Sequence, residues 1–228
     1  MNVTNPIKQY LSYLWPITSR YDSDHYGYLE VSYVNGRKML DSNYSNHSFG
    51  LTQELYEFAL SRIPVYENDR ILMLGLGAAG FLELIEQKHG YSGKLTAVEI
   101  DSSVIEIGKE HFGLDSKPNL KIIHDDALQF VQGHHDKYDL VLVDILIDHL
   151  VPLECYMLPF WSQVSRLVVP GGRVIFNAGV DPFKDVRIES FRVRLKPFIN
   201  FDYHYRAAGY HSLLTGYAGV PGKSRYYY

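Results

Sequence analysis

The chain has 228 residues, of which 46% are hydrophobic and 21% are charged, so it can bury a sizeable core and is too apolar to be disordered. Its formal net charge is −4 and its lysines and arginines are scattered, which argues against a nucleic-acid partner. Its single cysteine, Cys155, cannot form an internal disulfide, and no apolar run is long enough to cross a membrane. We expect a cytoplasmic protein without a membrane partner. Its ten histidines show no metal-ligand spacing, so we expect no metal.

The N-terminal part of the chain is predicted to form a β-hairpin followed by a helix. Residues 26–34 alternate in β-rich character, Asn35-Gly36 is a strong two-residue turn signal, and residues 37–41 resume the strand. A helical pattern starts at Thr52 and is ended by Pro64. We therefore divide the chain into an N-terminal hairpin and helix region, residues 1–66, and a larger domain, residues 67–228.

The larger domain opens with a short apolar run that leads into three glycines. Residues 70–80 read Arg-Ile-Leu-Met-Leu-Gly-Leu-Gly-Ala-Ala-Gly, with the glycines spaced G-x-G-x-x-G, and a helical pattern follows at once. A buried strand, a tight glycine turn and a helix N-terminus together let the backbone lie against a nucleoside cofactor. Glu99 ends the next predicted strand about 20 residues further on, where this type of site places its ligand to the ribose hydroxyls.

From residue 70 onward, predicted strands and helices alternate. Nearly continuous apolar strands separated by amphipathic helices indicate a parallel sheet that is covered on both faces. The last two strands are too close in sequence for a crossover helix and are predicted to pair as a hairpin. We therefore predict an α/β fold, a Rossmann-like doubly wound and mostly parallel seven-stranded sheet with an antiparallel C-terminal hairpin. The predicted strands are residues 70–74, 94–100, 119–124, 138–144, 172–178, 199–206 and 210–217, and the helices are 80–89, 102–112, 126–133, 153–168 and 185–195.

Polar residues follow each of the first five predicted strands. In open α/β sheets the ligand lies outside the carboxyl ends of the strands, so these residues are predicted to share one edge. Each could also be a helix cap, because aspartate and asparagine commonly accept hydrogen bonds from the free amides of a helix start. Beyond the glycines, they are Glu99 and Asp101, Asp125 and Asp126, Asp144 with Asp148 soon after, and Asn177.

These motifs resemble the class I S-adenosylmethionine-dependent transferases, and within them the spermidine-synthase-like branch. The matching segments are L-G-L-G-A-A-G, V-E-I-D, D-D-A-L-Q-F, Y-D-L-V-L-V-D and V-V-P-G-G-R-V, in the order and approximate spacing of that branch. Leu40-Asp41 is similar to its L-D-G element. The resemblance covers roughly residues 24–180.

The resemblance implies a role for each site residue. S-adenosylmethionine, or its decarboxylated form, would be the cofactor, with Gly75, Gly77 and Gly80 around its methionine part. Asp144 would lie beside the reacting centre, where a carboxylate can take the proton of an attacking nitrogen, and Asp148 would assist it. The remaining cofactor-binding positions are Glu99 and Ile100 at the ribose and Asp126 and Ala127 at the adenine.

The sequence departs from the spermidine synthases at several positions. Ala78 occupies the place of the aspartate that meets the amine of the decarboxylated donor in the family's G-G-G-D-G-G loop. Asp144 and Asp148 are one residue further apart than the family's D-S-x-D, Ser45 replaces a glutamine, and no Y-H-E is found. We therefore expect methyl transfer to a small acceptor.

Three alternatives stay open. Polyamine aminopropyl transfer would use Asp144, Asp148 and Glu154 as a polycation pocket, although the last two could equally be acids at a solvated helix start. A non-catalytic cofactor-binding homologue would explain the altered loops. An NAD-dependent oxidoreductase fits the glycine spacing, but little chain remains after the fifth strand for a second domain.

The C-terminal tyrosines have two interpretations. Tyr203, Tyr205, Tyr210 and Tyr217 could line an aromatic acceptor pocket, or they could belong to the core or to the face of a homodimer, since aromatic residues dominate both. Trp15 and Trp161 are expected to be packed.

Overall fold

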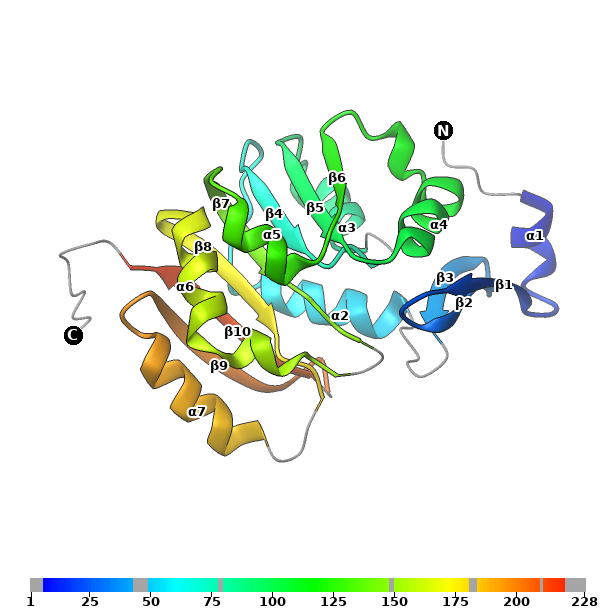
Figure 1. Cartoon of the computed structure of the whole chain (residues 1–228). Coiled ribbons are helices and arrows are strands. Elements are labelled where there is room, and N and C mark those ends of the chain that lie inside the picture. The colour runs from blue at the N-terminus through cyan, green and yellow to red at the C-terminus, as the bar shows by residue number, and fades with distance from the viewer. Residues whose placement is uncertain are drawn as a thin grey trace.

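The computed structural model describes residues 6–42, 49–77, 80–147, 150–180, 184–209 and 211–219. Its centre is a large sheet whose strands run in the spatial order β6-β5-β4-β7-β8-β10-β9, and a separate small sheet lies at one end (Figure 1). The first five of these strands are parallel, and β10 is antiparallel to both of its neighbours, which confirms the predicted fold class. The strands are β4 (Ile71–Leu74), β5 (Leu95–Glu99), β6 (Leu120–His124), β7 (Tyr138–Val143), β8 (Val168–Asn177), β9 (Ile199–Ala207) and β10 (His211–Ala218).

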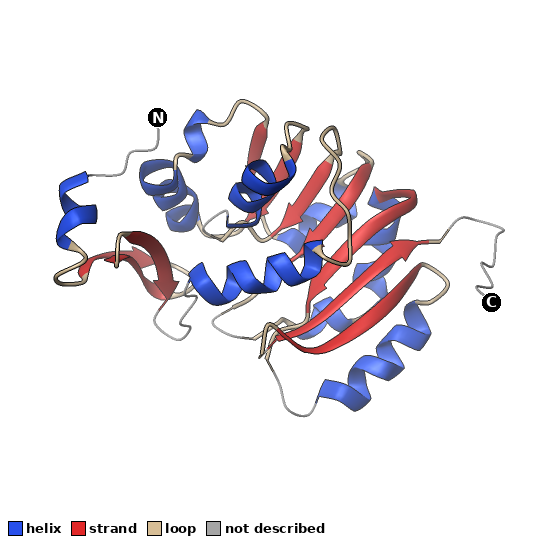
Figure 2. Ribbon diagram, turned by 180° about the vertical axis from the view of Figure 1, so that it is seen from behind, coloured by secondary structure: helices blue, strands red, loops and turns tan. Residues whose placement is uncertain are grey.

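Helices cover both faces of the large sheet (Figures 1 and 2). Because side chains alternate along a strand, Leu72 and Leu74 of β4 face one apolar cluster while Ile71 and Met73 face the other. The strands are therefore buried on both sides and read as continuous apolar runs. The helices α2 (Phe49–Leu60) and α3 (Gly80–His89) pack on one face, and α5 (Ala127–Gly133), α6 (Leu158–Leu167) and α7 (Lys184–Leu195) pack on the other.

The helix α4 (Ser102–Phe112) joins the two sheets. Its start is capped by Asp101, whose carboxylate accepts hydrogen bonds from the amides of Ser103 and Val104, and it ends at Gly113, which has a φ of 68°. Its outer face buries Val104 and Ile107 against the small sheet. A short 3₁₀ turn, Leu114–Ser116, follows.

The N-terminal region differs from the predicted hairpin. The predicted strands and turn are present as β2 (Gly27–Val34) and β3 (Arg37–Ser42), but β1 (Ile17–Ser23) adds a third antiparallel strand and is preceded by the helix α1 (Pro6–Leu11). The sequence of β1, Ile-Thr-Ser-Arg-Tyr-Asp-Ser, has few apolar residues. Its residues alternate between half-buried and exposed positions, and none is fully buried. Such an edge strand has little hydrophobic signal.

Two further details correct the sequence predictions. The helix predicted over residues 153–168 is divided into a 3₁₀ turn, Leu153–Tyr156, and α6, which has Pro159 in its first turn. Trp161 is fully buried as expected, but Trp15 is 77% exposed, so its predicted packing is wrong.

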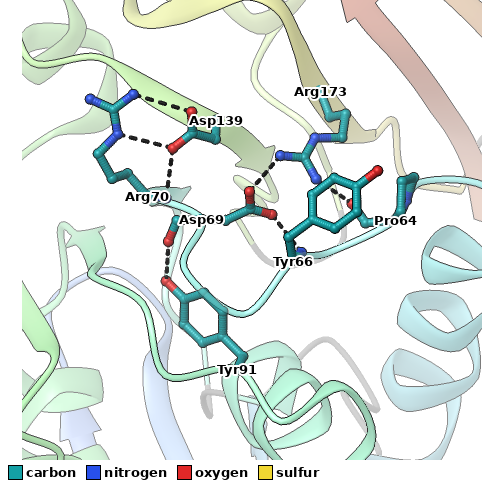
Figure 3. A network of polar contacts seen from close by, with 7 residues as sticks. All are labelled: Pro64, Tyr66, Asp69, Arg70, Tyr91, Asp139 and Arg173. Atoms are coloured by element: carbon teal, nitrogen blue, oxygen red, sulfur yellow. Dashed lines mark hydrogen bonds and ion pairs between the residues drawn. The ribbon is translucent and has the colours of Figure 1, made fainter.

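A polar network ties together the edge of the sheet where β4, β7 and β8 face away from the glycine turn (Figure 3). Arg173 of β8 and Asp69, each only 6% exposed, form an ion pair of 2.7 Å. The same guanidinium donates to the carbonyl of Pro64, and Asp69 also accepts from the amide of Tyr66. This pair therefore fixes the entry into β4 against β8.

We expect Arg173→Met to lower the free energy of unfolding by about 3–5 kcal/mol, because it leaves the Asp69 carboxylate buried without its cation. Lys109→Met is the matched control: Lys109 pairs with Glu106 on the surface, so the loss should stay under about 1 kcal/mol. Denaturant unfolding of both variants measures the difference. Equal losses would show that the buried pair contributes no more than a surface pair.

Candidate functional site

A cavity of about 310 Å³ opens at the carboxyl ends of the strands, where the chain order reverses between β4 and β7. This is the switch point at which open α/β sheets bind their ligands. The cavity is lined by the loops that follow β4, β5, β6 and β7, by the end of β8, by α2, and by β2 and β3 of the small sheet. The sequence predicted this edge of the sheet as the site.

The glycine turn after β4 brings the backbone against this cavity. Gly75 has a φ of 94°, and a Cβ placed on it would lie 2.1 Å from the carbonyl oxygen of Asp144. Gly77 also has a positive φ, of 51°, yet nothing would lie within 4 Å of a Cβ there. Position 75 therefore requires glycine, because a side chain would collide with the backbone of Asp144 and because its φ is positive. The backbone at Gly77 stays open to a ligand. Gly80 begins α3 and lines the cavity, whereas Ala78 lies outside the described residues.

Glu99 is buried at the end of β5, with 5% of its surface exposed, and it lines the cavity. Its two carboxylate oxygens accept hydrogen bonds from the amides of Leu76 and Asp101, each at 3.0 Å. Burial raises the pKa of Glu99, and hydrogen bonds from the amides of Asp101, Leu76 and Gly77 oppose that rise. The carboxylate is therefore held rigidly between the glycine turn and the start of α4.

Three more predicted cofactor residues line the same cavity. Asp126 caps α5 by accepting a hydrogen bond from the amide of Leu128 at 2.8 Å through Oδ1. The helix-cap interpretation is therefore correct, but it does not exclude ligand binding, since Asp126 also lines the cavity. Ile100 and Ala127 line the cavity as well.

Asp144, the predicted catalytic residue, follows β7 directly and is held by two side chains. Its Oδ1 accepts a hydrogen bond from Asn177 Nδ2 at 2.8 Å, and its Oδ2 accepts one from the Tyr56 hydroxyl at 2.5 Å. Asn177 is oriented in turn, because its Oδ1 accepts from the amide of Gly179 and lies 3.1 Å from His211 Nδ1. The carboxylate therefore has a fixed direction at the base of the cavity.

Tyr56 and His211 were not predicted from the sequence as site residues. Tyr56 comes from α2 and His211 begins β10, and both line the cavity. Burial and the nearby Asp144 carboxylate raise the pKa of the Tyr56 hydroxyl well above its ordinary value, so it stays a donor at neutral pH. A tyrosine in an amphipathic helix reads as a core residue, and nothing nearby in the sequence points to Asp144.

Other predicted residues have different positions. Asp148 lies outside the described residues. Glu154 lines the cavity. Asp101 is fully used as the cap of α4 and as the acceptor of a hydrogen bond from Ser23.

The small sheet contributes one wall of the cavity. Tyr26, Leu40 and Asp41 line it, and the Tyr26 hydroxyl donates to the carbonyl of Leu146, in the loop after β7, at 2.9 Å. The Ser23 hydroxyl also donates to Asp101, so the small sheet is attached both to the loop after β7 and to the start of α4.

The cavity is acidic. Its described lining includes five carboxylates and no lysine or arginine. Such a lining favours positively charged ligands. The carboxylates are Asp41, Glu99, Asp126, Asp144 and Glu154.

The C-terminal tyrosines lie elsewhere. Tyr203 packs against the core, and Tyr205 and Tyr217 are about half-exposed, so none of the three lines the cavity, while Tyr210 lies outside the described residues. Cys155 is buried, which raises the pKa of its thiol to about 12. Within the described ranges, no cluster of three potential metal ligands occurs and no helix is long and apolar enough to cross a membrane.

Sequence similarity to a polyamine aminopropyl transferase extends over much of this chain. It is 26% identical over 172 residues to a probable polyamine aminopropyl transferase of Bifidobacterium longum, an alignment that covers 72% of this chain and 38% of the relative. The chain thus spans well under two thirds of that relative.

Solved structures support the same fold. A probable spermidine synthase from Corynebacterium glutamicum superposes with a TM-score of 0.67 at 16% identity, over 88% of this chain and 80% of that one. Human methyltransferase-like protein 13, in complex with SAH, gives 0.58 at 18% identity, over 80% and 86%. A model of the spermine/spermidine synthase domain matches residues 49–219, which comprise the whole large sheet and its helices. The chain belongs to the spermine/spermidine synthase domain family.

Proposed function

We propose that this protein transfers an alkyl group from an S-adenosyl sulfonium donor to a nitrogen of a small cationic amine, with aminopropyl transfer from decarboxylated S-adenosylmethionine as the first choice. The observation that carries the proposal is the acidic cavity at the switch point, with Asp144 next to the glycine turn and no lysine or arginine in its described lining. A donor without a carboxylate suits this lining better than S-adenosylmethionine itself. Family membership and the names of the relatives favour the same choice.

The residues present fit such a donor. The open backbone at Gly77 leaves room for a ligand to approach, and the buried Glu99 carboxylate has lone pairs beyond those that its backbone hydrogen bonds use. Asp126 and Ala127 also line the cavity, and we place the adenine ring of the donor beside them. When bound, the donor supplies an electrophilic carbon with a built-in leaving group.

The protein's own contribution is to orient the acceptor and take its proton. An alkylammonium group in water has a pKa near 10, so at neutral pH the acceptor nitrogen is protonated and must lose a proton before it can attack. Asp144 is positioned to accept that proton, because the hydrogen bonds from Tyr56 and Asn177 fix its carboxylate at the base of the cavity.

Methyl transfer is the second candidate. One observation favours it: Ala78 stands where spermidine synthases carry the aspartate that meets the amine of the decarboxylated donor. The two donors differ only in the carboxylate, so their relative affinities decide between the reactions.

We expect decarboxylated S-adenosylmethionine to bind at least about tenfold more tightly than S-adenosylmethionine in calorimetric titrations, because a carboxylate in this acidic cavity is repelled. Mass spectrometry of an incubation with 1,4-diaminobutane should then show addition of an aminopropyl group. Preference for S-adenosylmethionine with a methylated product would establish the second candidate. Donor binding without any product would indicate a non-catalytic protein, and binding of neither donor would contradict the proposal.

We expect donor affinity to depend on ionised Glu99. Because the pKa of Glu99 is raised, affinity should fall on acidification at a pH above the ordinary glutamate value of about 4.3. Glu99→Gln should bind at least about tenfold more weakly at neutral pH and lose that pH dependence. Titrations at several pH values measure both, with Glu106→Gln on the exposed face of α4 as the control. If donor affinity varied with pH in the same way for Glu99→Gln and wild type, Glu99 would not contact the donor.

We expect Tyr56→Phe to lower kcat by about 10- to 100-fold, since a hydrogen bond to a charged group contributes about 1.5–3 kcal/mol. Donor affinity should change less than about twofold. Tyr91→Phe is the matched control, because Tyr91 is also buried but donates to the carbonyl of Asp69 at the opposite edge of the sheet. Steady-state kinetics compare the two variants, and equal kcat values would show that Tyr56 does not act through Asp144.

A further inference from the structure

His211 is a cavity-lining side chain at the start of β10, the strand that lies next to β8 in the large sheet (Figure 1). Two backbone hydrogen bonds hold the strand start in place. The amide of Ala178 donates to the carbonyl of Ser212 at 2.8 Å, and the amide of Ser212 donates to the carbonyl of Gly179 at 2.9 Å. The imidazole is thereby held against the Asn177 side chain, with its Nδ1 3.1 Å from Asn177 Oδ1.

The Asn177 side-chain amide has one orientation that satisfies its neighbours. Its Oδ1 accepts from the backbone amide of Gly179 at 3.0 Å, and a backbone N–H can only donate. Its Nδ2 donates to Asp144 Oδ1 at 2.8 Å, and an ionised carboxylate can only accept. Because Asn177 Oδ1 is an acceptor, His211 Nδ1 has to carry a hydrogen and donate it. The neutral imidazole is therefore fixed as the Nδ1–H tautomer.

The backbone that leads into β10 has two irregular features. The pairing of β9 with β10 shifts in register between His211 and Leu213, as in a β-bulge. Arg206 and Ala208, at the end of β9 and just after it, have φ values of 50° and 49°, which residues with a side chain rarely adopt. Bulges redirect nearby side chains, and such backbone conformations gather at functional sites because they cost free energy elsewhere. A regular hairpin would avoid both features, so we attribute them to the placement of His211.

We propose that His211 is a positioning residue: it orients Asn177, and Asn177 orients the Asp144 carboxylate. The inference rests on the proposed function, in which Asp144 takes the proton of the attacking nitrogen. Because Asn177 is buried, its amide depends on partners within the protein. Without the imidazole, only the Gly179 contact holds its oxygen, and the Asp144 carboxylate can turn away from the nitrogen. Tyr56 holds the other carboxylate oxygen from α2, so two strands and a helix together set its direction.

The kinetic test removes and then restores the donor at position 211. We expect His211→Leu to lower kcat by about three- to tenfold, as the loss of one neutral hydrogen bond provides, and to leave donor affinity and acceptor KM within about twofold. His211→Asn should recover most of the lost kcat, because asparagine Nδ2 is as many bonds from the backbone as histidine Nδ1. His204→Leu is the matched control: His204 is a partly buried histidine of the same hairpin, but it contacts Thr215 and should keep the wild-type kcat.

The tautomer gives a second measurement that needs no turnover. Long-range proton–nitrogen NMR correlations at about pH 8, where an ordinary histidine is neutral, should show His211 as the Nδ1–H tautomer. Asn177→Leu, which removes the acceptor, should abolish that preference. In this background, His211→Leu should cause no further loss of kcat, because residues that act through one another are not additive.

These measurements separate the inference from the proposed function. The Nδ1–H tautomer, lost in Asn177→Leu, supports the link from His211 to Asn177 even if no product forms, in which case the proposed function alone fails. An Nε2–H tautomer in wild type, or an unchanged kcat in His211→Leu, would overturn the inference even if alkyl transfer takes place. Equal losses in His211→Leu and His211→Asn would overturn it as well. Unchanged thermal midpoints show that the variants are folded.

Discussion

The close approach of β4 and β7 at the switch point is the constraint on which the site depends. With no side chain on Gly75, the backbone of the turn can lie against the carbonyl of Asp144, where a Cβ would be only 2.1 Å away. This contact places the glycine turn, the end of β5 and Asp144 around one crevice. An alanine at Gly75 would have to move the end of β7, and the direction of the Asp144 carboxylate would change with it.

Burial of acids on one edge of a sheet requires compensation, and three of the acids here are compensated in different ways. Backbone amides hold Glu99, a tyrosine and an amide side chain hold Asp144, and a helix start holds Asp126. Asp41 alone among these four keeps a buried oxygen without a partner in the described chain. The three compensated acids are therefore preorganised.

The sequence was sufficient to predict the large sheet and the edge where its cavity opens, because parallel strands give strong apolar signals and their carboxyl ends must meet. Glu99, Asp126 and Asp144 followed from that rule, and all three line the cavity. Tyr56 could not be predicted, since it comes from a helix 88 residues before Asp144 and has no local pattern. The strand β1 was missed because its alternation is mostly polar.

The cavity takes its walls from two parts of the chain. The glycine turn, Glu99 and Asp126 belong to the large sheet and its loops, whereas Asp41 comes from β3 and Tyr26 from the turn that precedes β2. The contacts of Tyr26 with Leu146 and of Ser23 with Asp101 attach this sheet without using the side chains of Glu99 or Asp144. A change in β2 or β3 can therefore alter one wall of the cavity while Glu99 and Asp144 keep their hydrogen bonds.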